Sequence, residues 1–581
     1  MFKKLVGYTK GYGLKTILAP ITMIGEVLAE VAIPFLITYI GYAFEPGNQY
    51  YADMGYVVKI GLIMVACAFF ALICGILSAR FASAASTGFA KNLRQDLFDK
   101  VQDFSFKNTD KFTTASLVTR LTTDVMNTQM AFMMTIRMMV RAPLMLICAT
   151  VLAFIQNADL AIIYVVAVPV LAVGMYLVMS RAHPRFKKML KKFDKLNQTV
   201  QENLVGIRVV KAFVREEFEE EKFKSVSEAV RGAQVKAEKV IIFNMPIVQL
   251  VMYSTTIATV ILGGSIVVLG GLNVLELTSF LTYSSQILMS LTMLGMSVMM
   301  FTIAGASLTR IKEVLYEVPD IRDEEALDTT IPQNGEIVFD RVNFSYSGQT
   351  DNFVLKDINL TIPTGSTVGI IGGTGSAKTT LVQLIPRLYD VTEGEVRVGG
   401  VNVKDYKLNV LRNSVAMVLQ KNVLFSGTIK ENLRWGNKDA TDEELESACR
   451  AAAAHDFITS FPDGYDHYIE QGGVNVSGGQ KQRLCIARAL LSKPKVLILD
   501  DSTSAVDTAT DAMIRQGFKE RIGDTTVLII AQRINSVKDS DMIIVLDEGK
   551  INGVGTHEEL LKNNAIYREV YDSQQRGDDN E

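Results

Sequence analysis

The stretch VGIIGGTGSAKTTLVQLI contains residues whose types and order suit phosphate binding. An apolar run with the composition of a strand leads into a loop of small residues, and a helix-forming run follows. Backbone N–H groups of such a loop and of a helix N-terminus can surround phosphate oxygens. Lys378 can reach the outer phosphates, and the Thr379 hydroxyl can bind Mg²⁺. We therefore predict a nucleotide-binding loop made of Gly372, Gly373, Thr374, Gly375, Ser376, Ala377, Lys378, Thr379 and Thr380.

Ala377 departs from the motif G-x-x-x-x-G-K-[ST], because it occupies the position of the last glycine. Alanine keeps the backbone N–H donor, so the change is tolerable where the backbone is already helical. Where φ must be positive, or where phosphate lies against Cα, the added methyl group weakens binding. The sequence leaves both outcomes open, and for the loop on its own a chance glycine-rich turn is the alternative.

A candidate metal-binding carboxylate follows in KVLILDDS, which has the composition of a buried strand and ends at Asp500. A carboxylate in this place can hold Mg²⁺ through water beside a nucleotide. Between the two stretches stands NVSGGQKQRLCIARALL, in which a small polar turn opens an amphipathic helix. Such a turn offers backbone donors and a helix N-terminus to an anion. Together these segments predict an α/β domain that binds a nucleotide.

The elements that must position this site belong to the second half of the chain. The first half differs from it in being mostly apolar. Residues 1–315 are apolar in blocks, and hydrophobic residues make up 49% of the whole chain. The mean hydropathy is +0.22, which points to a membrane-embedded part. Six blocks are long enough for the roughly 20 residues that cross a bilayer. They cover approximately residues 16–44, 57–80, 134–156, 159–180, 243–269 and 277–301.

The connections between the blocks indicate how the chain crosses the membrane. The short connections contain no Lys or Arg, whereas those near 81–133 and 181–240 contain many. By the positive-inside rule, the long connections and both chain ends face the cytoplasm. Helical spacing in the long connections predicts that the helices continue into the cytosol, with distal tips near 105–114 and 215–222. Independent soluble hairpins are the alternative, although no Pro/Gly break separates them from the spans.

Ionisable and methionine side chains within the spans are candidate substrate contacts. Glu26 and Glu30 lie one turn apart, and intramembrane carboxylates normally face a cavity or a partner. They either bind a cationic substrate or form a structural pair satisfied by polar neighbours. Arg137 and Arg141 lie near the cytoplasmic start of the third block, where snorkelling explains them more simply. Methionines crowd the sixth block and suit either a promiscuous surface or ordinary packing; they are Met289, Met293, Met296, Met299 and Met300.

The remaining features narrow the class of protein. The net charge of -3 does not indicate nucleic-acid binding, and the spacing of the five cysteines indicates neither a zinc site nor disulfides. The basic start MFKKLVGYTKGYG lacks a cleavable apolar core, so we interpret it as an amphipathic segment on the membrane. An acidic linker with two prolines covers residues 316–335. We place the soluble α/β domain at residues 336–575 and a disordered tail at 576–581.

The motifs of the second half, taken in order, resemble those of one family. The phosphate loop, VLQKNVLFSGTIKENL, VSGGQ, LILDD, SAVD and IIAQR resemble the ATP-binding cassette domain of ABC transporters, and VSGGQKQR is highly specific. The first half, with ENLVGIRVVKAF and SLVTRLTTDV, resembles the exporter branch, the half-transporters of multidrug and lipid-flippase type. The resemblance covers essentially the whole chain. It implies an all-α transmembrane domain of six helices with long cytosolic helical extensions, an α/β P-loop cassette domain with a helical subdomain, and ATP with Mg²⁺ as cofactors.

The resemblance also implies a role for each matching residue. Tyr346 would stack on adenine, and Gln420 would touch Mg²⁺ and the attacking water, with Thr379 and Asp500 as the other metal-site residues. Asp507 would lie at the dimer contact. The distal tips would be coupling helices docked on cassettes, the second tip on the cassette of the other subunit. The stretch VSGGQ is the signature of the family. Its residues Ser477, Gly478, Gly479 and Gln480 would bind the γ-phosphate of a nucleotide held by the other subunit.

The sequence departs from the family pattern where hydrolysis would occur. Asp501 replaces the usual Glu, Gln532 the usual switch His, and Gln471 the usual Glu ahead of the signature. A group that activates water must come within roughly 2.6–3.2 Å of it, and Asp501 is one C–C bond shorter than Glu. A misplacement of about 1 Å can lower a rate on the order of 100-fold. Gln532 cannot become a cation, so positive charge beside the γ-phosphate is lost. The candidate catalytic residues are thus Asp501, Gln532 and Gln420.

These changes weaken hydrolysis more than nucleotide binding, and they predict a heterodimer with unequal ATP sites. In such dimers each site joins one chain's phosphate loop to the other chain's signature. A second half-transporter would then supply Glu and His at the stronger site. The predicted function is ATP-driven efflux of amphipathic small molecules of multidrug type across the plasma membrane, with amphipathic drugs, cationic ones among them, slightly favoured over lipids or peptides. The alternatives are a lipid or peptide exporter, a homodimer, and a mainly regulatory nucleotide-binding subunit.

Overall fold

The structure is a computed structural model that describes residues 6–45, 47–323, 331–350, 352–501, 508–521 and 523–578. The chain divides into two compact units. The first comprises Met1–Gln102 and Thr114–Glu317, and the second comprises Asp103–Thr113 and Val318–Glu581. A short segment from the first half of the sequence therefore belongs to the second unit.

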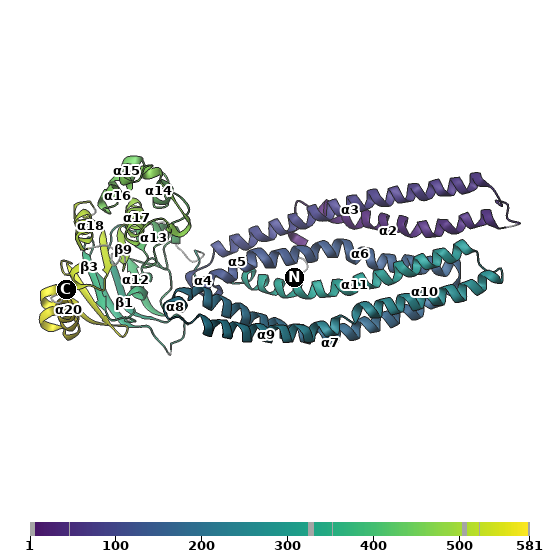
Figure 1. Ribbon diagram of the computed structural model, residues 1–581. Coiled ribbons are helices and arrows are strands. Elements are labelled where there is room, and N and C mark those ends of the chain that lie inside the picture. The colour runs from purple at the N-terminus through teal and green to yellow at the C-terminus, as the bar shows by residue number, and fades with distance from the viewer. Residues whose placement is uncertain are drawn as a thin grey trace. The chain divides into compact units, whose positions relative to one another are not determined.

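The first unit consists of long helices (Figure 1). Six helical stretches in the described part of the chain are long and apolar enough to cross a membrane, as predicted. Helices α3 and α7 have 49 and 48 residues, so they continue well past the roughly 20 that a bilayer requires. The helices are α2 (Gly13–Gly41), α3 (Met54–Gln102), α5 (Thr114–Thr119), a π-helical turn (Arg120–Asp124), α6 (Val125–Gln156), α7 (Ala158–Val205), α8 (Ile207–Ala212), α9 (Glu216–Ile241), α10 (Asn244–Val268) and α11 (Val274–Leu315).

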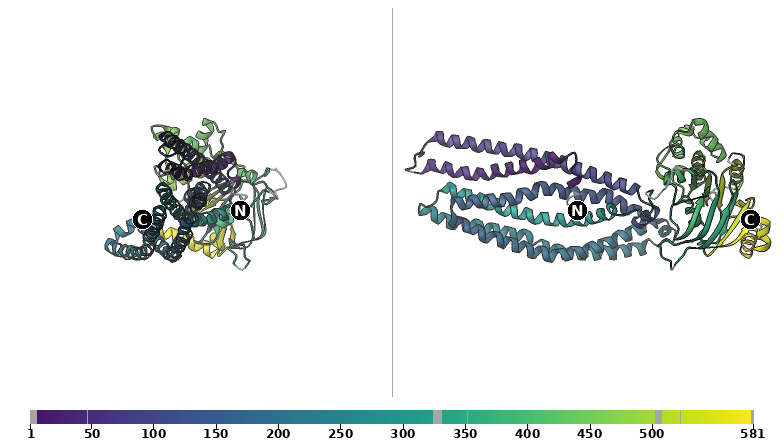
Figure 2. Two further views of the ribbon diagram at one scale, coloured as in Figure 1. Left: turned by 90° about the vertical axis from the view of Figure 1, so that its right-hand side faces the viewer. Right: turned by 180° about the vertical axis from the view of Figure 1, so that it is seen from behind.

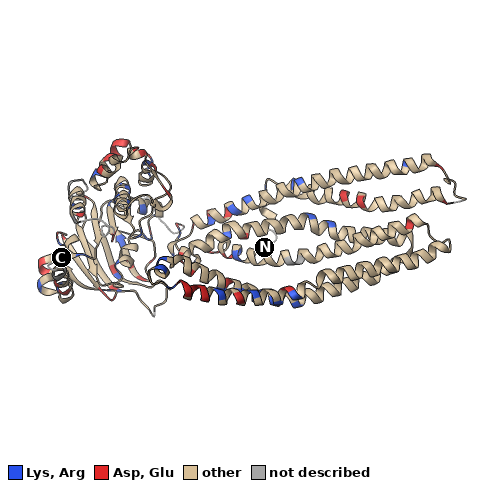
Figure 3. Cartoon of the chain, in the orientation of Figure 1, with Lys and Arg blue, Asp and Glu red and all other residues tan. Residues whose placement is uncertain are grey.

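Apolar side chains and buried tyrosines hold this helical unit together. Residues of α2, α6, α7 and α11 form one buried cluster. The Tyr164 hydroxyl donates to the Phe280 carbonyl at 2.7 Å, and the Tyr283 hydroxyl donates to the Val31 carbonyl at 3.2 Å, so neither buried hydroxyl is unsatisfied. Helices α7 and α9 run side by side (Figure 1), as the view from behind also shows (Figure 2). Charged residues gather toward the α8 end of the unit and are sparse near the α10–α11 connection (Figure 3).

The structure places one distal tip as predicted and moves the other. The first tip is α4 (Phe106–Phe112), which belongs to the second unit. The second tip forms around α8 (Ile207–Ala212), ahead of the predicted 215–222. Helix α7 ends at Gly206, because glycine lowers helix propensity. Helix α9 begins at Glu216, where acidic residues in the first turn favour a helix N-terminus.

The second unit is built around two β-sheets (Figure 1). The larger sheet has the order β12-β11-β3-β10-β9-β6, and its strands are parallel except for the edge strand β12. A smaller antiparallel sheet has the order β2-β1-β4-β5, and β7 pairs with β8. The strands are β1 (Ile337–Phe344), β2 (Leu355–Ile362), β3 (Thr367–Gly372), β4 (Glu393–Val398), β5 (Val401–Asn402), β6 (Val415–Val418), β7 (Gly427–Thr428), β8 (Tyr468–Ile469), β9 (Val496–Asp500), β10 (Thr526–Ile530), β11 (Met542–Asp547) and β12 (Lys550–Gly555).

Helices cover the parallel sheet and extend into a helical subdomain, which confirms the predicted α/β domain. One buried cluster joins the two sheets and α12, and another joins the parallel sheet to α14–α17. Helix α20 continues to Asp578, past the predicted start of the tail at 576, and residues 579–581 lie outside the described residues. The helices are α12 (Lys378–Gln383), α13 (Leu408–Ser414), α14 (Ile429–Leu433), α15 (Asp442–Ala451), α16 (His455–Ser460), α17 (Gly478–Leu491), α18 (Thr508–Arg521), α19 (His557–Asn563) and α20 (Ala565–Asp578).

Candidate functional site

The predicted site residues come together at the carboxyl ends of neighbouring strands. Strand β3 ends at Gly372, and β9 ends at Asp500, which lies opposite Ile530 of the intervening β10. Gln532 follows β10, and Gln420 follows β6, the other neighbour of β9. Because these strands are parallel, their carboxyl ends meet at one edge of the sheet. The topology thereby gathers positions that are far apart in the sequence.

The start of α12 lies beside the carboxylate predicted to bind Mg²⁺. Thr379 Oγ1 donates to Asp500 Oδ1 at 2.9 Å, so a hydroxyl and a carboxylate oxygen meet as the hard ligands that suit Mg²⁺. Lys378 Nζ donates to the carbonyl oxygens of Gly372 and Gly373, each at 2.8 Å. Burial raises the pKa of the Asp500 carboxyl and lowers the pKa of the Lys378 ammonium group. A bound cation and a phosphate would each favour the charged form, so these residues fit an Mg²⁺–nucleotide.

Ala377 has the left-handed backbone conformation, with φ 71° and ψ 26°. This is the outcome in which the replaced glycine matters, because an L-residue with a side chain is disfavoured there by roughly 1–2 kcal/mol. The neighbouring left-handed position, Gly375 at φ 84°, has kept its glycine. The loop is therefore strained at one residue of its phosphate-binding turn.

Replacing Ala377 by Gly is expected to raise the free energy of unfolding by about 1 kcal/mol, because the strain that the loop carries without nucleotide is removed. Thermal unfolding of the purified protein measures the change. Ala377→Ser is the matched control, since it keeps a Cβ in the same conformation and should be no more stable than the natural protein. Equal stabilities of the Gly and Ser variants would contradict this account of the loop.

The candidate catalytic side chains meet on one carboxylate oxygen. Gln532 Nε2 donates to Asp501 Oδ2 at 2.8 Å, and Gln420 Nε2 lies 3.4 Å from the same oxygen. Asp501 itself has a positive φ of 49°, and its N–H donates to the Ile530 carbonyl at 3.1 Å. Gln532 thus holds the Asp501 carboxylate, so two residues predicted to depart from the family pattern meet at one contact.

Gln574 is a supporting residue of this site that sequence reasoning missed. Its Nε2 donates to the Gln532 carbonyl at 2.8 Å, and its Oε1 accepts the Ile534 N–H at 2.9 Å. Residues 532–534 are thereby hydrogen-bonded to helix α20. No motif marks Gln574, because the contact depends on how the C-terminal helix folds back.

The residues of the predicted signature lie at the start of α17. Ser477 caps the helix: its N–H donates to Gln480 Oε1 at 2.9 Å, and its Oγ accepts the Gln480 N–H at 3.2 Å. Ser477 and Gly478 are exposed. Among the described residues, no hydrogen bond joins the signature to the phosphate loop. Asp507, predicted at a dimer contact, lies outside the described residues.

Comparison with known proteins decides which family this arrangement belongs to. Residues 16–291 match the family model described as ABC transporter transmembrane region, and residues 355–504 match the one described as ABC transporter. The uncharacterized ABC transporter ATP-binding protein YfiB of Bacillus subtilis is 35% identical over 572 residues, which cover 98% of each chain. This chain belongs to the ABC transporter family. It is an exporter half-transporter, with a membrane domain fused to a nucleotide-binding domain.

A second relative and a solved structure of the same fold are also similar to this ABC transporter. The probable multidrug resistance ABC transporter ATP-binding/permease protein YheI of Bacillus subtilis is 36% identical over 425 residues, 73% of this chain and 72% of that protein. A bacterial Atm1-family ABC exporter with ATP bound has the same fold, with a TM-score of 0.81, 24% identity, and coverage of 98% of this chain and 99% of that one. The transporter is thus a multi-pass membrane protein, and its cassette is of the kind that binds ATP with Mg²⁺ and hydrolyses it for transport.

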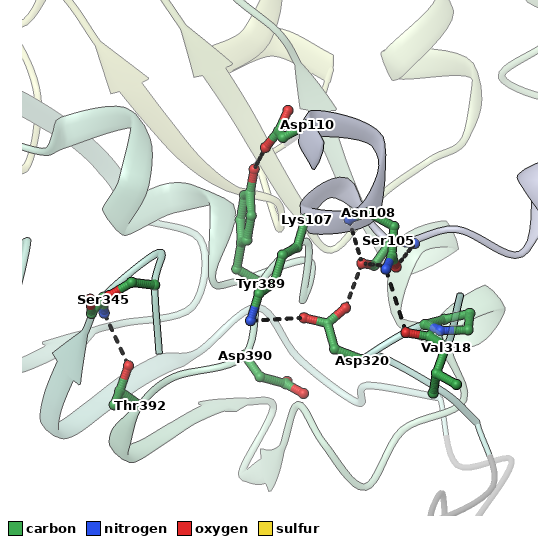
Figure 4. A network of polar contacts seen from close by, with 12 residues as sticks. Ser105, Lys107, Asn108, Asp110, Val318, Asp320, Ser345, Tyr389, Asp390 and Thr392 are labelled. Atoms are coloured by element: carbon green, nitrogen blue, oxygen red, sulfur yellow. Dashed lines mark hydrogen bonds and ion pairs between the residues drawn. The ribbon is translucent and has the colours of Figure 1, made fainter. Parts of the chain in front are cut away.

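Tyr346, the predicted adenine contact, lies next to the phosphate-loop helix of the transporter. Its hydroxyl is 2.9 Å from Thr380 Oγ1, and 43% of the residue is exposed. Its ring meets the Tyr389 ring edge-to-face, with centroids 5.1 Å apart at 88°. The Tyr389 hydroxyl donates to Asp110 Oδ2 of α4 at 2.8 Å (Figure 4). Sequence reasoning did not identify Tyr389 or Asp110.

Helix α4 is also bound to the segment that follows α11 (Figure 4). The Ser105 hydroxyl donates to the Asp320 carboxylate, and Lys107 Nζ lies 4.0 Å from the same side chain. Asn108 Nδ2 lies 3.4 Å from the Val318 carbonyl. All of these residues belong to the second unit, so the predicted first coupling helix packs on the cassette of its own chain.

The intramembrane carboxylates of the transporter are paired with an arginine. Arg141 Nη1 donates to Glu26 Oε1, and Arg141 Nη2 donates to Glu30 Oε2 at 2.7 Å. The structure therefore favours a structural pair over a free site for a cationic substrate. Snorkelling was the wrong interpretation of Arg141, whose guanidinium turns toward α2. Arg137 has no ion-pair partner among the described residues.

Proposed function

We propose that this chain is one subunit of a heterodimeric ABC exporter that moves amphipathic small molecules, of multidrug type, across the plasma membrane. Its own ATP site would hold ATP for longer than it hydrolyses it, and its signature would complete the catalytic site of the partner. The observation that carries the proposal is the 2.8 Å contact of Gln532 with Asp501. Two groups that should act on water and γ-phosphate are bound to one another instead.

Nucleotide binding uses groups that this chain retains. Lys378 and the loop N–H groups would hold the phosphates, and Tyr346 presents an exposed ring to the base. Thr379 and Asp500 would hold Mg²⁺. When bound, Mg²⁺ supplies positive charge that neutralises the β- and γ-phosphate oxygens.

Two features of the same site would slow hydrolysis: the short side chain of Asp501 and the absence of a positive charge on Gln532. The Asp501 side chain is one C–C bond shorter than that of glutamate. Its carboxylate accepts hydrogen bonds from Gln532 and Gln420. Gln532 is neutral at every pH, so it adds no positive charge where negative charge develops. ATP therefore stays bound here while a site with Glu and His turns over.

The exposed second tip supports an intertwined assembly. Val209, Phe213 and Val214 around α8 are 60%, 72% and 81% exposed. Apolar groups gathered at a helix tip mark an interaction surface, and in exporters that this chain resembles the second tip docks on the other subunit's cassette. The cassette and the chain ends would face the cytoplasm.

Replacing Phe213 and Val214 together by Asp is expected to prevent stable dimerisation, because two charges would be desolvated on docking. Size-exclusion chromatography with light scattering in detergent measures the mass of the assembly. Replacing two exposed residues of helix α10, Ile257 and Ile261, by Val is the control and should leave the dimer intact. A full-mass dimer of the Asp variant would show that this tip does not dock.

The proposed cargo rests on the relative named for multidrug resistance and on two exposed methionines of α11, Met289 and Met296 at 64% and 60%. Because Arg141 pairs with Glu26 and Glu30, these carboxylates give no support to a preference for cations.

Reconstitution with a half-transporter that carries the missing Glu and His tests the proposal. ATP-dependent uptake of fluorescent amphipathic drugs into inverted vesicles should require both chains. It should stop when the partner's glutamate is replaced by Gln. Brisk drug-stimulated ATP hydrolysis by this chain purified alone would overturn the heterodimer and its slow site.

A further inference from the structure

Tyr389 occupies a position between the adenine side of the ATP site and helix α4. It is 9% exposed and touches three aromatic rings edge-to-face: Tyr346 at 5.1 Å, Phe344 at 5.8 Å and Phe106 at 6.1 Å between centroids. Two of these rings belong to strand β1 and the residues after it, and Phe106 belongs to α4. One side chain therefore joins the two elements by packing.

The polar end of Tyr389 makes a directional link in the same place. Its hydroxyl donates to Asp110 Oδ2 at 2.8 Å (Figure 4). Burial raises the pKa of Tyr389, so the phenol stays protonated and remains a donor at neutral pH. A hydrogen bond to a carboxylate is stronger than one between neutral groups, and partial burial strengthens it further.

The segment that carries Tyr389 is anchored to the core of the second unit through Arg387. Asp390 accepts from Arg387 Nε at 2.8 Å, and Arg387 Nη1 donates to the Lys404 carbonyl at 3.1 Å. Arg387 is 4% exposed and is thus held in the core. On the nucleotide side, the Tyr346 hydroxyl lies 2.9 Å from Thr380 Oγ1 of α12, and 43% of the residue is exposed.

We propose that Tyr389 is a positioning residue that makes the docking of α4 depend on the adenine base bound at Tyr346. Stacking of the base fixes the Tyr346 ring, the Tyr346 ring fixes Tyr389, and the Tyr389 hydroxyl holds Asp110. This inference rests on the proposed retention of ATP at this chain's own site. The retained nucleotide then keeps α4 docked while the partner's site turns over.

The prediction concerns the base rather than the phosphates. In the purified full-length chain, Mg-ATP should slow amide hydrogen exchange of residues 103–113 about tenfold, the effect of one charge-assisted hydrogen bond. Mg-tripolyphosphate, which has the phosphates without a base, should leave exchange unchanged. Tyr389→Phe keeps the ring contacts and loses the donor, so it should still bind ATP, at most about tenfold more weakly because the coupling is reciprocal, and lose the protection.

Two further variants separate this role from general stability. Ser105→Ala removes the contact with Asp320 but leaves Tyr389 intact, so exchange should rise in all states while the response to ATP remains. Asp110→Asn keeps an acceptor and should retain part of the response. Protection by tripolyphosphate, or full protection by ATP in Tyr389→Phe, would overturn the proposal.

Equilibrium dialysis of labelled ATP in the same samples distinguishes the possible failures. Absence of ATP binding would overturn the proposed function of the site. ATP binding without protection of residues 103–113 would overturn only the link through Tyr389.

Discussion

Replacing Asp501 by Glu and Gln532 by His together is expected to raise ATP turnover at this chain's site on the order of 100-fold, with little change in ATP affinity. The longer side chain restores reach toward the attacking water. The imidazole frees the carboxylate from its 2.8 Å contact with Gln532 and restores a group that can carry positive charge. Steady-state hydrolysis by the purified chain, in which both sites of a dimer carry the same residues, measures the gain.

Two controls assign the gain to this site. Adding Lys378→Ala to the double variant should abolish the gain, since Lys378 belongs to the phosphate loop. Each single replacement should give much less than the pair, because Asp501 and Gln532 are in direct contact and their effects are coupled. Unchanged hydrolysis in the double variant would mean that Asp501 already works as the catalytic group.

Replacing Arg141 by Met is expected to destabilise the membrane unit by about 3–5 kcal/mol, because one partner of a mostly buried ion cluster is removed. Side-chain exposures of 14% for Glu26 and 22% for Arg141 make these two groups mostly buried, whereas Glu30 is 37% exposed. Two carboxylates would then face apolar surroundings without a counterion. Thermal unfolding of the purified protein in detergent measures the loss.

The triple variant Glu26→Gln, Glu30→Gln, Arg141→Met is the matched control. It removes every charge of the cluster and should recover most of the lost stability, because no unpaired ion remains. An Arg141→Met protein as stable as the natural one would show that the carboxylates do not depend on Arg141.

Motifs with short, fixed spacing could be predicted from the sequence alone. The phosphate loop and the Ser477–Gln480 cap are such motifs, because their geometry is set by neighbouring residues. The place of Asp500 at the end of a buried strand followed from the apolar composition of the residues before it. The six spans followed from block length and apolar composition.

Contacts between distant segments could not be predicted in the same way. Nothing local in the sequence pairs Arg141 with Glu26, Tyr389 with Asp110, or Gln574 with the switch, because each pair depends on how whole elements pack. The predicted position of the second tip was wrong because of the weight given to neighbouring residues in the sequence. A continuous apolar stripe was given more weight than Gly206, which ends α7.

The backbone of the phosphate loop shows what a motif leaves open. The sequence shows Ala377 in place of glycine, but only the structure shows that its φ is 71°. The replacement of glycine by alanine carries a cost because the backbone has this positive φ; at a helical φ it would not.

The central claim is that this chain's site retains intact ATP during transport. The most direct test is a photoreactive ATP analogue labelled on both the α- and γ-phosphates, crosslinked to the working transporter after many turnovers and recovered from each chain separately. The account predicts that label on this chain keeps its γ-phosphate while label on the partner has lost it. Equal loss of the γ-phosphate from both chains would contradict the account.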